Sequence, residues 1–470
     1  MSVGLYLHAV RAARPRQIER RLTRPLRRRL VPGAADAGPP APLEELVPFW
    51  RSAAFARAEG SHPGGRLAGF AAAYNGSVLE AARAGDAARA AALLDDARGG
   101  DRWHPYVVST RILNWVAALS LAPALATAGV GESLRRQLAF LRRNVEDDVL
   151  GNHVLRNATA LLLGGVSVGD DSSVRLGRLL FARELPEQVL PDGGHYERSP
   201  AYHRLVLRDL LQAAPYADVQ RAVAAMTGFA VLSSRPDGAP WLFNDGGADV
   251  APALELEAPA DGLSLARDTG YAFLRRPGLS LAFDCGPPAP EFLPAHAHAD
   301  ALSFQLWLDG APAVVDPGTS TYEPGERRAW ERGTRAHSTV AVDGDQFRLW
   351  GAFRSGPLPA VRLTHADSST VAGEVLLRGG VVHRRTIALG ERSLLVEDRV
   401  EGEGRHTIVS SLPVAQGSPL RVEPLAGSAE EEPATYAERF GETRGARAHV
   451  VRVDALLPWE GGWRLSWGAP

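Results

Sequence analysis

Two histidines that lie one residue apart are the side chains of this sequence best placed to do chemistry together. The chain has thirteen histidines in 470 residues, and His296 and His298 are the pair in the run His-Ala-His-Ala-Asp. Imidazole titrates near neutral pH and is the commonest metal-ligating side chain. If this segment is a strand, both rings lie on one face, and the site is built on a sheet. The alternative is a pair of hydrogen-bonded histidines at the start of a strand.

Three further segments concentrate polar side chains. In Gly151 to Asn157, a helix would place His153 and Arg156 on one face. Residues 188–203 bring two tyrosines, two histidines and two acids into a turn, and the pair Ser199-Pro200 is typical of a helix start. The third segment, residues 336–339, precedes a β-rich run.

Taken together, these segments resemble the heparinase II/III family of polysaccharide lyases. The resemblance covers roughly residues 100–360, and several degenerate motifs in one order are far more specific than any one of them. The motifs, in the family's order, are Asn152-His153 with Arg156, Pro191-Asp192-Gly193 leading to Glu197-x-Ser199-Pro200-x-Tyr202-His203, His296-x-His298-x-Asp300-x-x-Ser303-Phe304, Val315-Asp316-Pro317-Gly318 and His337-Ser338-Thr339. The family's architecture is an α/α toroid followed by a β-sandwich.

The resemblance implies cleavage of a uronic-acid polymer by β-elimination, which breaks the C4–O bond and leaves an unsaturated uronate. The substrate carboxylate must be neutralised so that negative charge can build up at C5. A base must take the C5 proton, and an acid must protonate the leaving oxygen.

Five residues are the candidates for this chemistry. Asn152 offers amide donors to the carboxylate and Arg156 a cationic fork, while His153 and His296 are candidates for neutralisation or for the base. Tyr202 is the best candidate acid and also a candidate base. Its ordinary pKa of about 10 suits neutral pH poorly, so we expect Arg156 or a protonated histidine to lower it.

Each assignment has a structural alternative. Asn152 could cap the helix that contains Leu155, and Tyr202 could be a core tyrosine with a satisfied hydroxyl. Arg156 could be a solvated helix residue, and other members of the family have an acid at its place.

Further residues are expected to line the substrate cleft, because flat aromatic faces suit sugar rings and cations suit uronates. The alternative for all of them is packing between helices. They are Trp103, Tyr106, Arg111, Asn114 and Trp115, together with His195, Tyr196, Glu197 and His203.

The resemblance also implies a structural zinc held within the sandwich. The matching ligands are His298, Asp316 and His337, and two imidazoles with a carboxylate and a water are a reasonable zinc set. In this hypothesis His296 faces the sugar and His298 the metal. The alternative is that Asp316 only holds the turn through Gly318. No organic cofactor is expected.

The elements that must position these residues change in kind along the chain. Between residues 70 and 211, apolar residues recur at helical spacing, and Gly, Pro and Asp mark the joints. From Tyr271 onward, short β-rich runs alternate with turns, as is typical of an antiparallel sandwich. These runs are 279–283, 313–315, 338–342, 371–377, 381–387, 393–397, 406–411 and 463–467.

The predicted fold is therefore an incomplete α/α toroid of helical hairpins followed by an antiparallel β-sandwich. We expect a basic N-terminal arm and linker over residues 1–43, the toroid over 44–250 and the sandwich over 251–470. The arm carries nine arginines and one acid, Glu19, between Arg11 and Arg29. Such an arm could meet a membrane surface, a nucleic acid or a polyanionic substrate, or it could be an arginine-rich surface helix.

Composition narrows the remaining choices. A net charge of −2 gives no argument for nucleic acid, and 45% hydrophobic residues are ordinary for a globular protein. The single cysteine, Cys285, excludes an intrachain disulfide and a multi-cysteine zinc site. No apolar stretch is long enough to span a bilayer, and the first residues are too polar for a signal peptide, so a cytoplasmic location is expected unless an export signal is missing.

The leading hypothesis is thus a lyase whose partner is an acidic polysaccharide or oligosaccharide. Two alternatives stay open. One is a glycan-binding or exopolysaccharide-assembly protein that keeps the fold without turnover. The other is a hydrolase in which zinc at His298, Asp316 and His337 activates water.

Overall fold

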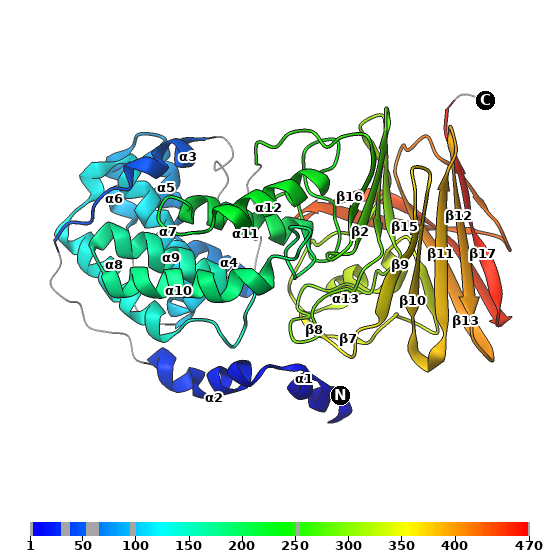
Figure 1. Cartoon of the computed structure of the whole chain (residues 1–470), viewed down its shortest axis with the longest axis horizontal. Helices are drawn as coiled ribbons and strands as arrows, with labels where there is room; N and C mark the ends of the chain where they lie inside the picture. The colour runs from blue at the N-terminus through cyan, green and yellow to red at the C-terminus, as the bar shows by residue number, and fades with distance from the viewer. Residues whose placement is uncertain (1–2, 30–37, 53–64, 95–99, 251–253, 469–470) are drawn as a thin grey trace.

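Among the described residues, every α-helix except one precedes the first strand, as the sequence predicts. The computed structural model describes residues 3–29, 38–52, 65–94, 100–250 and 254–468. An incomplete α/α toroid forms one half of an elongated molecule, and an antiparallel β-sandwich forms the other half (Figure 1).

The helical half is built from hairpins of adjacent antiparallel helices. Helix α9 lies at its centre and packs against α7, α8, α10 and α11. The helices are α1 Val3–Ala12, α2 Pro15–Arg29, α3 Val47–Arg51, α4 Gly65–Ala73, α5 Gly76–Arg83, α6 Ala87–Leu93, α7 Pro105–Leu121, α8 Ala128–Arg143, α9 Asn152–Val168, α10 Asp171–Gln188, α11 Pro200–Ala213 and α12 Gln220–Leu232, with α13 Glu326–Arg332 among the strands.

Local sequence explains where two of these helices begin. The Ser199 hydroxyl accepts a hydrogen bond from the Tyr202 backbone N–H at 3.1 Å, and Pro200 occupies the first turn of α11. This confirms the predicted helix start. Helix α9 begins after Gly151, whose φ is +59°, and a Cβ at that position would lie 2.0 Å from a carboxylate oxygen of Glu197. Only glycine therefore allows the helix end to approach Glu197 so closely.

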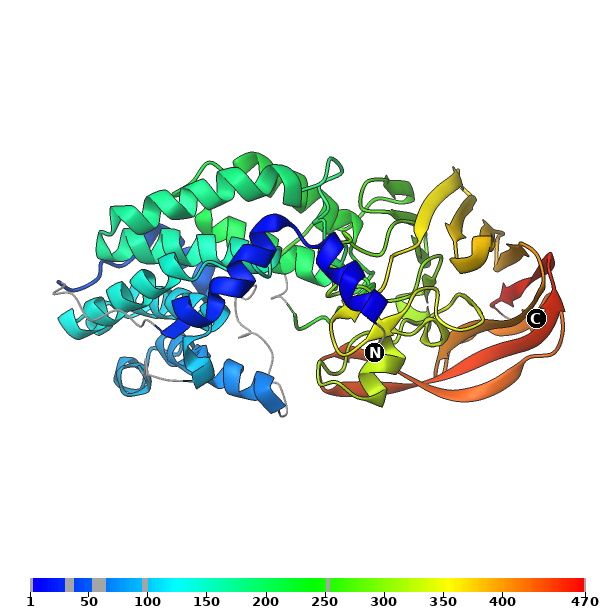
Figure 2. The same ribbon diagram turned by 90° about the horizontal axis from the view of Figure 1, so that it is seen from below.

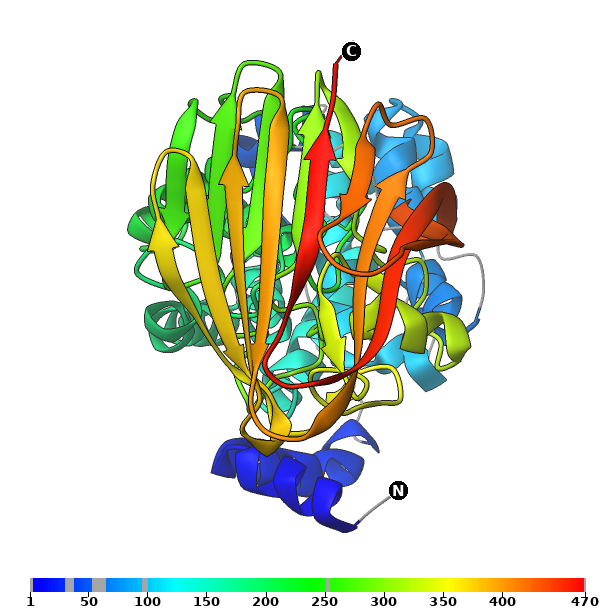
Figure 3. The ribbon, with the colours of Figure 1, turned by 90° about the vertical axis from the view of Figure 1, so that its right-hand side faces the viewer.

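Two antiparallel sheets make up the sandwich (Figure 3). The larger has the order β1-β2-β3-β4-β5-β13-β16-β15 with β6 paired to β13, and the smaller has the order β14-β17-β12-β11-β10-β9. The strands are β1 Gly262–Ala266, β2 Tyr271–Arg276, β3 Leu279–Asp284, β4 Phe304–Leu308, β5 Ala311–Val314, β6 Val340–Val342, β7 Leu349–Trp350, β8 Arg354–Ser355, β9 Ala360–Ala366, β10 Thr370–Leu376, β11 Val382–Leu389, β12 Ser393–Glu401, β13 Arg405–Ala415, β14 Arg421–Pro424, β15 Glu430–Arg439, β16 Glu442–Leu456 and β17 Trp459–Ser466.

Alternating side chains of the two sheets form one apolar core. Strand β12 shows the period most clearly, because Leu394, Val396 and Val400 are fully buried between charged or partly exposed neighbours. Every β-rich run predicted from the sequence overlaps a strand. The apolar core therefore forms between the two sheets, from the alternating apolar residues of the predicted strands.

The segment around His296 and His298 is a loop, so the predicted strand there is wrong. Strand β4 begins only at Phe304, and Leu302 has a φ of +63°. The backbone of the loop bonds to other loops instead of to a neighbouring strand, since the His298 N–H donates to the side chain of Asn244. The two rings nevertheless converge, because the loop wraps around Asp245.

The two N-terminal helices form a separate arm along one side of the molecule. Helix α2 lies below the toroid in Figure 1, and α1 lies below the neighbouring strand-rich half near β7 and β8; both helices are in front of the rest of the molecule in Figure 2. Among the described residues, no helix has the length and apolar character needed to cross a membrane.

Candidate functional site

One cavity of about 400 Å³ brings together residues from both halves of the molecule. The helical half contributes His104, Tyr106 and Tyr202 to its wall, and the strand-rich half contributes His296 and Tyr322. The remaining lining residues are Phe70, Tyr74, Val149, Leu150, Asn152, His153, Glu197, Leu205, Asp249, Val250, Leu293, Ala295, Phe353 and Phe440. The cavity therefore holds four of the five predicted catalytic residues.

Asn152 is fixed at the start of α9 by a buried carboxylate. Its backbone N–H donates to a Glu197 oxygen at 2.7 Å, and its side-chain amide lies 3.1 and 3.2 Å from the two oxygens. Burial alone would raise the pKa of Glu197, but attraction to His296 and His195 and the Asn152 N–H lowers it. Asn152 is the first residue of the helix and does not cap it, since the N-cap position belongs to Gly151.

His153, the next residue, forms an ion pair with Glu146. Its Nδ1 lies 3.1 Å from Glu146, its ring packs on Tyr106 with centroids 4.6 Å apart, and its side chain is 28% exposed to the cavity. Burial lowers the pKa of His153, but Glu146 outweighs burial and raises it. In turn, His153 holds the pKa of Glu146 at about 2 despite complete burial. The resting pair is thus a carboxylate and an imidazolium.

His296 is clamped between two acids. Its Nδ1 lies 2.9 Å from Asp245, and its Nε2 lies 3.2 Å from Glu197. The ring donates to both carboxylates at once only as the imidazolium. With both nitrogens occupied, His296 is suited to stabilising negative charge and not to accepting a proton.

Asp245 is the anchor of this cluster. It is fully buried and receives hydrogen bonds from His296, His298 and the guanidinium of Arg328, whose Nη2 lies 2.8 Å away. Burial would raise the pKa of Asp245, but Arg328 and the two histidines hold it well below its ordinary value. A permanent carboxylate therefore orients both histidines of the motif.

Tyr202 and Tyr322 share a hydrogen bond at the cavity wall. Their hydroxyl oxygens are 2.8 Å apart, and the Tyr202 ring lies 3.9 Å from the His296 ring. Burial raises the pKa of both hydroxyls well above 10. The expectation that a nearby cation lowers the pKa of Tyr202 is therefore wrong, because burial raises this pKa and the neighbouring Tyr322 and Asp245 raise it further. The hydroxyl is protonated at neutral pH, as an acid must be.

Arg156 does not reach the cavity. Its Nε donates to Asp209 at 2.5 Å and its Nη1 to Thr110 at 3.1 Å, and the side chain is only 1% exposed. The helix turns it toward α7 and α11, so it is neither the expected cationic fork nor a solvated helix residue. Arg156 therefore links α9 to α11 through Asp209 and does not face the cavity.

Four residues of the predicted cleft wall are instead packing residues of α7 and of the segment before it. Arg111 donates to Gln137, Asn114 to the backbone oxygen of Tyr74, and the Trp115 ring nitrogen to Asn75. Trp103 packs edge-on against Phe140, with ring centroids 5.1 Å apart. Of this set only Tyr106 lines the cavity, because α7 is covered by neighbouring helices on nearly every side.

The predicted cleft residues in the turn before α11 and at its start likewise divide into one that lines the cavity and others that pack behind it. Glu197 lines the cavity, whereas His195, Tyr196 and His203 are buried behind it. His195 pairs with Gln188, the Tyr196 hydroxyl accepts the Gly151 N–H, and His203 donates to the Met226 carbonyl. Burial lowers the pKa of His195 to about 4 and that of His203 to about 3, so both rings are neutral packing groups.

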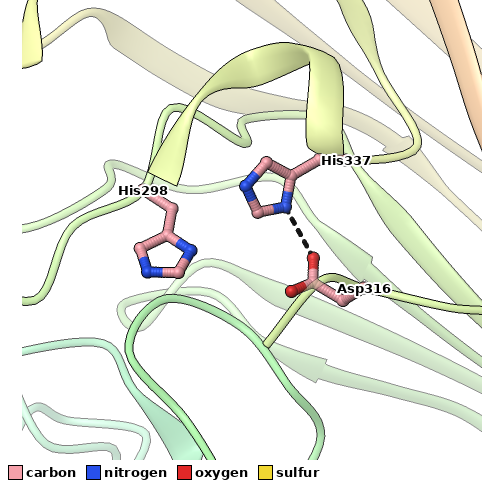
Figure 4. A group of neighbouring side chains, drawn as sticks. All are labelled: His298, Asp316 and His337. Atoms are coloured by element: carbon pink, nitrogen blue, oxygen red, sulfur yellow. Dashed lines mark hydrogen bonds and ion pairs between the residues drawn. The ribbon is translucent and has the colours of Figure 1, made fainter. Parts of the chain in front are cut away.

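Behind the cavity, the structure assembles the three predicted metal ligands (Figure 4). One ligand atom each from His298, Asp316 and His337 lies within 4.8 Å of the others, and all three side chains are buried. His337 Nδ1 is 2.7 Å from one Asp316 oxygen, while the other Asp316 oxygen accepts the Gly318 N–H at 3.0 Å. Asp316 thus holds its turn and also faces the histidines.

The surroundings of these residues fit a metal ion. The His298 Nε2 is held by Asp245, which leaves the buried Nδ1 with no hydrogen-bond partner. An orienting carboxylate on the far nitrogen is typical of ligating histidines. Burial lowers the pKa of His298 to about 4, so its ring is neutral at pH 7, as ligation requires.

Sequence reasoning missed several residues of the site. Asp245, Arg328 and Tyr322 come from loops and the short helix α13, where no periodicity singles them out. Glu146 could have been found from the sequence, because it begins an acidic run, residues 146–148, that lies just before the Asn152-His153 motif.

The character of the cavity wall bears on the substrate. Seven of its lining residues are phenylalanine or tyrosine, and in the part of the chain described none of its lining residues is an arginine. The basic side chains of the described wall are the imidazoles of His104, His153 and His296, and Glu146 raises the pKa of His153. The wall thus offers sugar-stacking surfaces with little cationic charge.

The sequence matches two family descriptions in the expected order. Residues 101–228 match "Heparinase II/III N-terminus", and residues 258–454 match "Heparinase II/III-like, C-terminal".

Relatives and solved structures agree with these matches. FtsZ-localized protein C of Caulobacter vibrioides is 27% identical over 424 residues, which cover 81% of this chain and 70% of that protein. Heparin-sulfate lyase of Pedobacter heparinus is 27% identical over 298 residues, covering 51% of this chain and 44% of the lyase. The crystal structure of heparinase III superposes with a TM-score of 0.68 at 15% identity, over 84% of this chain and 77% of the other. The chain thus spans less than half the length of the heparin-sulfate lyase.

Proposed function

Because the chain belongs to the heparinase II/III family, we propose that it cleaves a uronic-acid-containing glycan by β-elimination at the C4–O bond. The observation that carries this proposal is the meeting of Asn152, His153, Tyr202 and His296 around one cavity. Each of the three tasks of the reaction has a side chain of suitable chemistry there.

In this mechanism, Asn152 and His153 neutralise the substrate carboxylate. The raised pKa of His153 keeps the ring cationic, and the amide of Asn152 exchanges Glu197 for the uronate oxygens. The His296 imidazolium adds positive charge beside Tyr202. Once the amide has made this exchange, charge that develops at C5 is stabilised by groups that are already in position.

Tyr202 carries out the proton transfers. In the reactive state its hydroxyl proton has been lost to solvent. The ionised oxygen then takes the C5 proton, the C–H electron pair becomes the C4–C5 double bond, and the C4–O bond breaks. The same hydroxyl then returns the proton to the leaving oxygen, so the enzyme ends in its starting state. Tyr322 holds the Tyr202 oxygen in place through their 2.8 Å hydrogen bond.

The cavity wall favours a substrate with few sulfates. Each sulfate needs a cationic partner when it is desolvated, and the described wall supplies imidazoles and aromatic rings but no arginine. We therefore propose an unsulfated or sparsely sulfated uronate glycan as the substrate.

The test is a search for the ultraviolet absorbance of the unsaturated product. The purified protein is incubated with unsulfated glucuronate glycans, alginate, heparan sulfate and chondroitin sulfate. We expect absorbance to rise with at least one unsulfated glycan and more slowly with the sulfated ones. The absence of any rise over the whole panel would contradict lyase activity, and a preference for the sulfated glycans would contradict only the substrate class.

We propose further that the ion held by His298, Asp316 and His337 is zinc and that its role is structural. Two imidazoles and one carboxylate form a typical zinc set. Bound there, zinc would tie the loop of His298 to the loops of Asp316 and His337.

The two alternative functions fit the site less well. A hydrolytic zinc needs an open position for water and substrate, but all three ligands are buried and none lines the cavity. A glycan-binding protein without turnover would not require the Tyr202–Tyr322 pair beside a clamped imidazolium.

The Glu146–His153 pair gives a prediction about pH. In the active state His153 is cationic and Tyr202 is ionised. This state carries the same number of protons as the state in which both groups are neutral. We therefore expect kcat/KM to be maximal at pH values between the pKa of His153 and the pKa of Tyr202. The acidic limb then reports the pKa of His153, which Glu146 raises. Replacing Glu146 by Gln lowers that pKa, so we expect the acidic limb to move to lower pH.

The measurement is the pH dependence of kcat/KM for wild type and Glu146→Gln. The matched control is Glu291→Gln, which removes an exposed carboxylate from the loop before His296 and should leave the limb in place. A Glu146→Gln profile whose acidic limb stays put or moves upward would overturn the role of the pair.

A further inference from the structure

Helix α2 of the N-terminal arm is packed with its charged face inward. Arg16 of α2 pairs with Glu184 at 2.9 Å and Arg24 with Asp148 at 3.1 Å, while Arg14, just before the helix, pairs with Glu187. These acids belong to α10 and to the loop that precedes α9. The interface of the arm with the toroid is therefore electrostatic.

The opposite face of α2 is apolar and exposed to solvent. Ile18, Leu22 and Leu26 follow one another at helical spacing, and Leu22 and Leu26 are 75% and 69% exposed. Helix α1 adds Leu7 and Val10, which are 50% and 59% exposed. In a typical surface helix of a globular protein, the apolar face is buried and the charged face is exposed.

Such exposure is concentrated in the arm. Among the described residues, six of the eleven exposed large apolar side chains belong to α1 and α2. Figure 2 shows both helices lying across one side of the molecule, with no other segment in front of them. A cluster of exposed apolar side chains of this kind marks a surface that binds a membrane or another molecule.

Charge identifies the kind of partner. The side chain of Arg11 is exposed at the end of α1, and Arg21 is exposed although its Nη2 donates to the Asp148 backbone oxygen at 3.2 Å. Glu19 is the only acid between Arg11 and Arg29. Shallow apolar side chains flanked by arginines match the interfacial region and the phosphates of an anionic bilayer.

We propose that the outer face of α1 and α2 binds the surface of an anionic membrane, with Leu22 and Leu26 inserted among the lipid chains. The inward ion pairs keep the catalytic half attached to the arm while its apolar face is in the bilayer. The protein would then present its cavity to glycans close to a membrane.

The first test is sedimentation of the full chain with vesicles made of equal parts phosphatidylglycerol and phosphatidylcholine. We expect wild type to sediment with these vesicles and much less with phosphatidylcholine alone. Leu22→Glu combined with Leu26→Glu should reduce partitioning by about tenfold or more. The matched control is Leu179→Glu, which changes a 63% exposed leucine of α10 and should bind like wild type.

A second measurement follows the side chain directly. A polarity-sensitive fluorophore is attached at Leu22→Cys or, as control, at Leu179→Cys, since the native Cys285 is buried. Anionic vesicles should shift the emission to shorter wavelength at position 22 and not at position 179. No shift at position 22, equal binding by the charged variant, or a wild-type dimer that the charged variant dissociates would each overturn the proposal.

Discussion

Replacing Tyr202 by Phe should lower kcat by about 10³-fold while substrate binding changes little. The substitution removes one hydroxyl and keeps the ring that packs 3.9 Å from His296. Because that hydroxyl carries both proton transfers in the proposed mechanism, no other group in the cavity replaces it. The measurements are the initial rate of unsaturated product and the affinity for an oligosaccharide.

Two other tyrosines serve as controls for this result. Tyr322→Phe keeps the transferring hydroxyl but removes its 2.8 Å partner, so a smaller loss of about tenfold is expected. Tyr216→Phe removes a hydroxyl outside the cavity and should leave kcat unchanged. A Tyr202→Phe variant that keeps a third or more of wild-type activity would rule out this residue as the acid.

Replacing His298 by Ala should remove the bound metal and destabilise the protein. The residue is fully buried, and its loss leaves only Asp316 and His337 as ligands and takes one partner from Asp245. We expect the free energy of unfolding to fall by about 3 kcal/mol, from the lost metal and the polar groups left without partners. Elemental analysis and thermal unfolding provide the measurements.

His296→Ala is the matched control, two residues away in the same loop. It should retain the metal but lose turnover, because the removed ring lies in the cavity between Glu197 and Asp245. A chelator should lower the unfolding temperature of wild type and of His296→Ala, but not that of His298→Ala. Metal loss from His296→Ala together with full metal content in His298→Ala would reverse the assignment of the two histidines.

Sequence periodicity predicted the two halves of the fold, because apolar spacing reports directly which faces are buried. It failed around His296, where Leu302 and the backbone bonds to other loops prevent a strand. Short runs that begin a strand and loops that contact other loops have similar composition, and only long-range contacts separate them.

The candidate site was predictable where its residues follow the resemblance to the family, as for Asn152, His153 and Tyr202. The predictions for Arg111 and Arg156 failed. Both are polar residues on helices, and their hydrogen-bond partners, Gln137 and Asp209, lie at least 26 residues away in the sequence. A helical sequence does not state which of its faces meets a neighbouring helix. Tyr322 and Asp245 were missed for the related reason that loops have no period.

The most direct test is ultraviolet absorbance during incubation of an unsulfated uronate glycan with wild type and with Tyr202→Phe, side by side. We predict a rise in absorbance with wild type, which shows that a C4–C5 double bond forms, and at most about one thousandth of that rate with the variant. Chain cleavage by wild type without any absorbance would instead mean hydrolysis, and it would contradict elimination at this site.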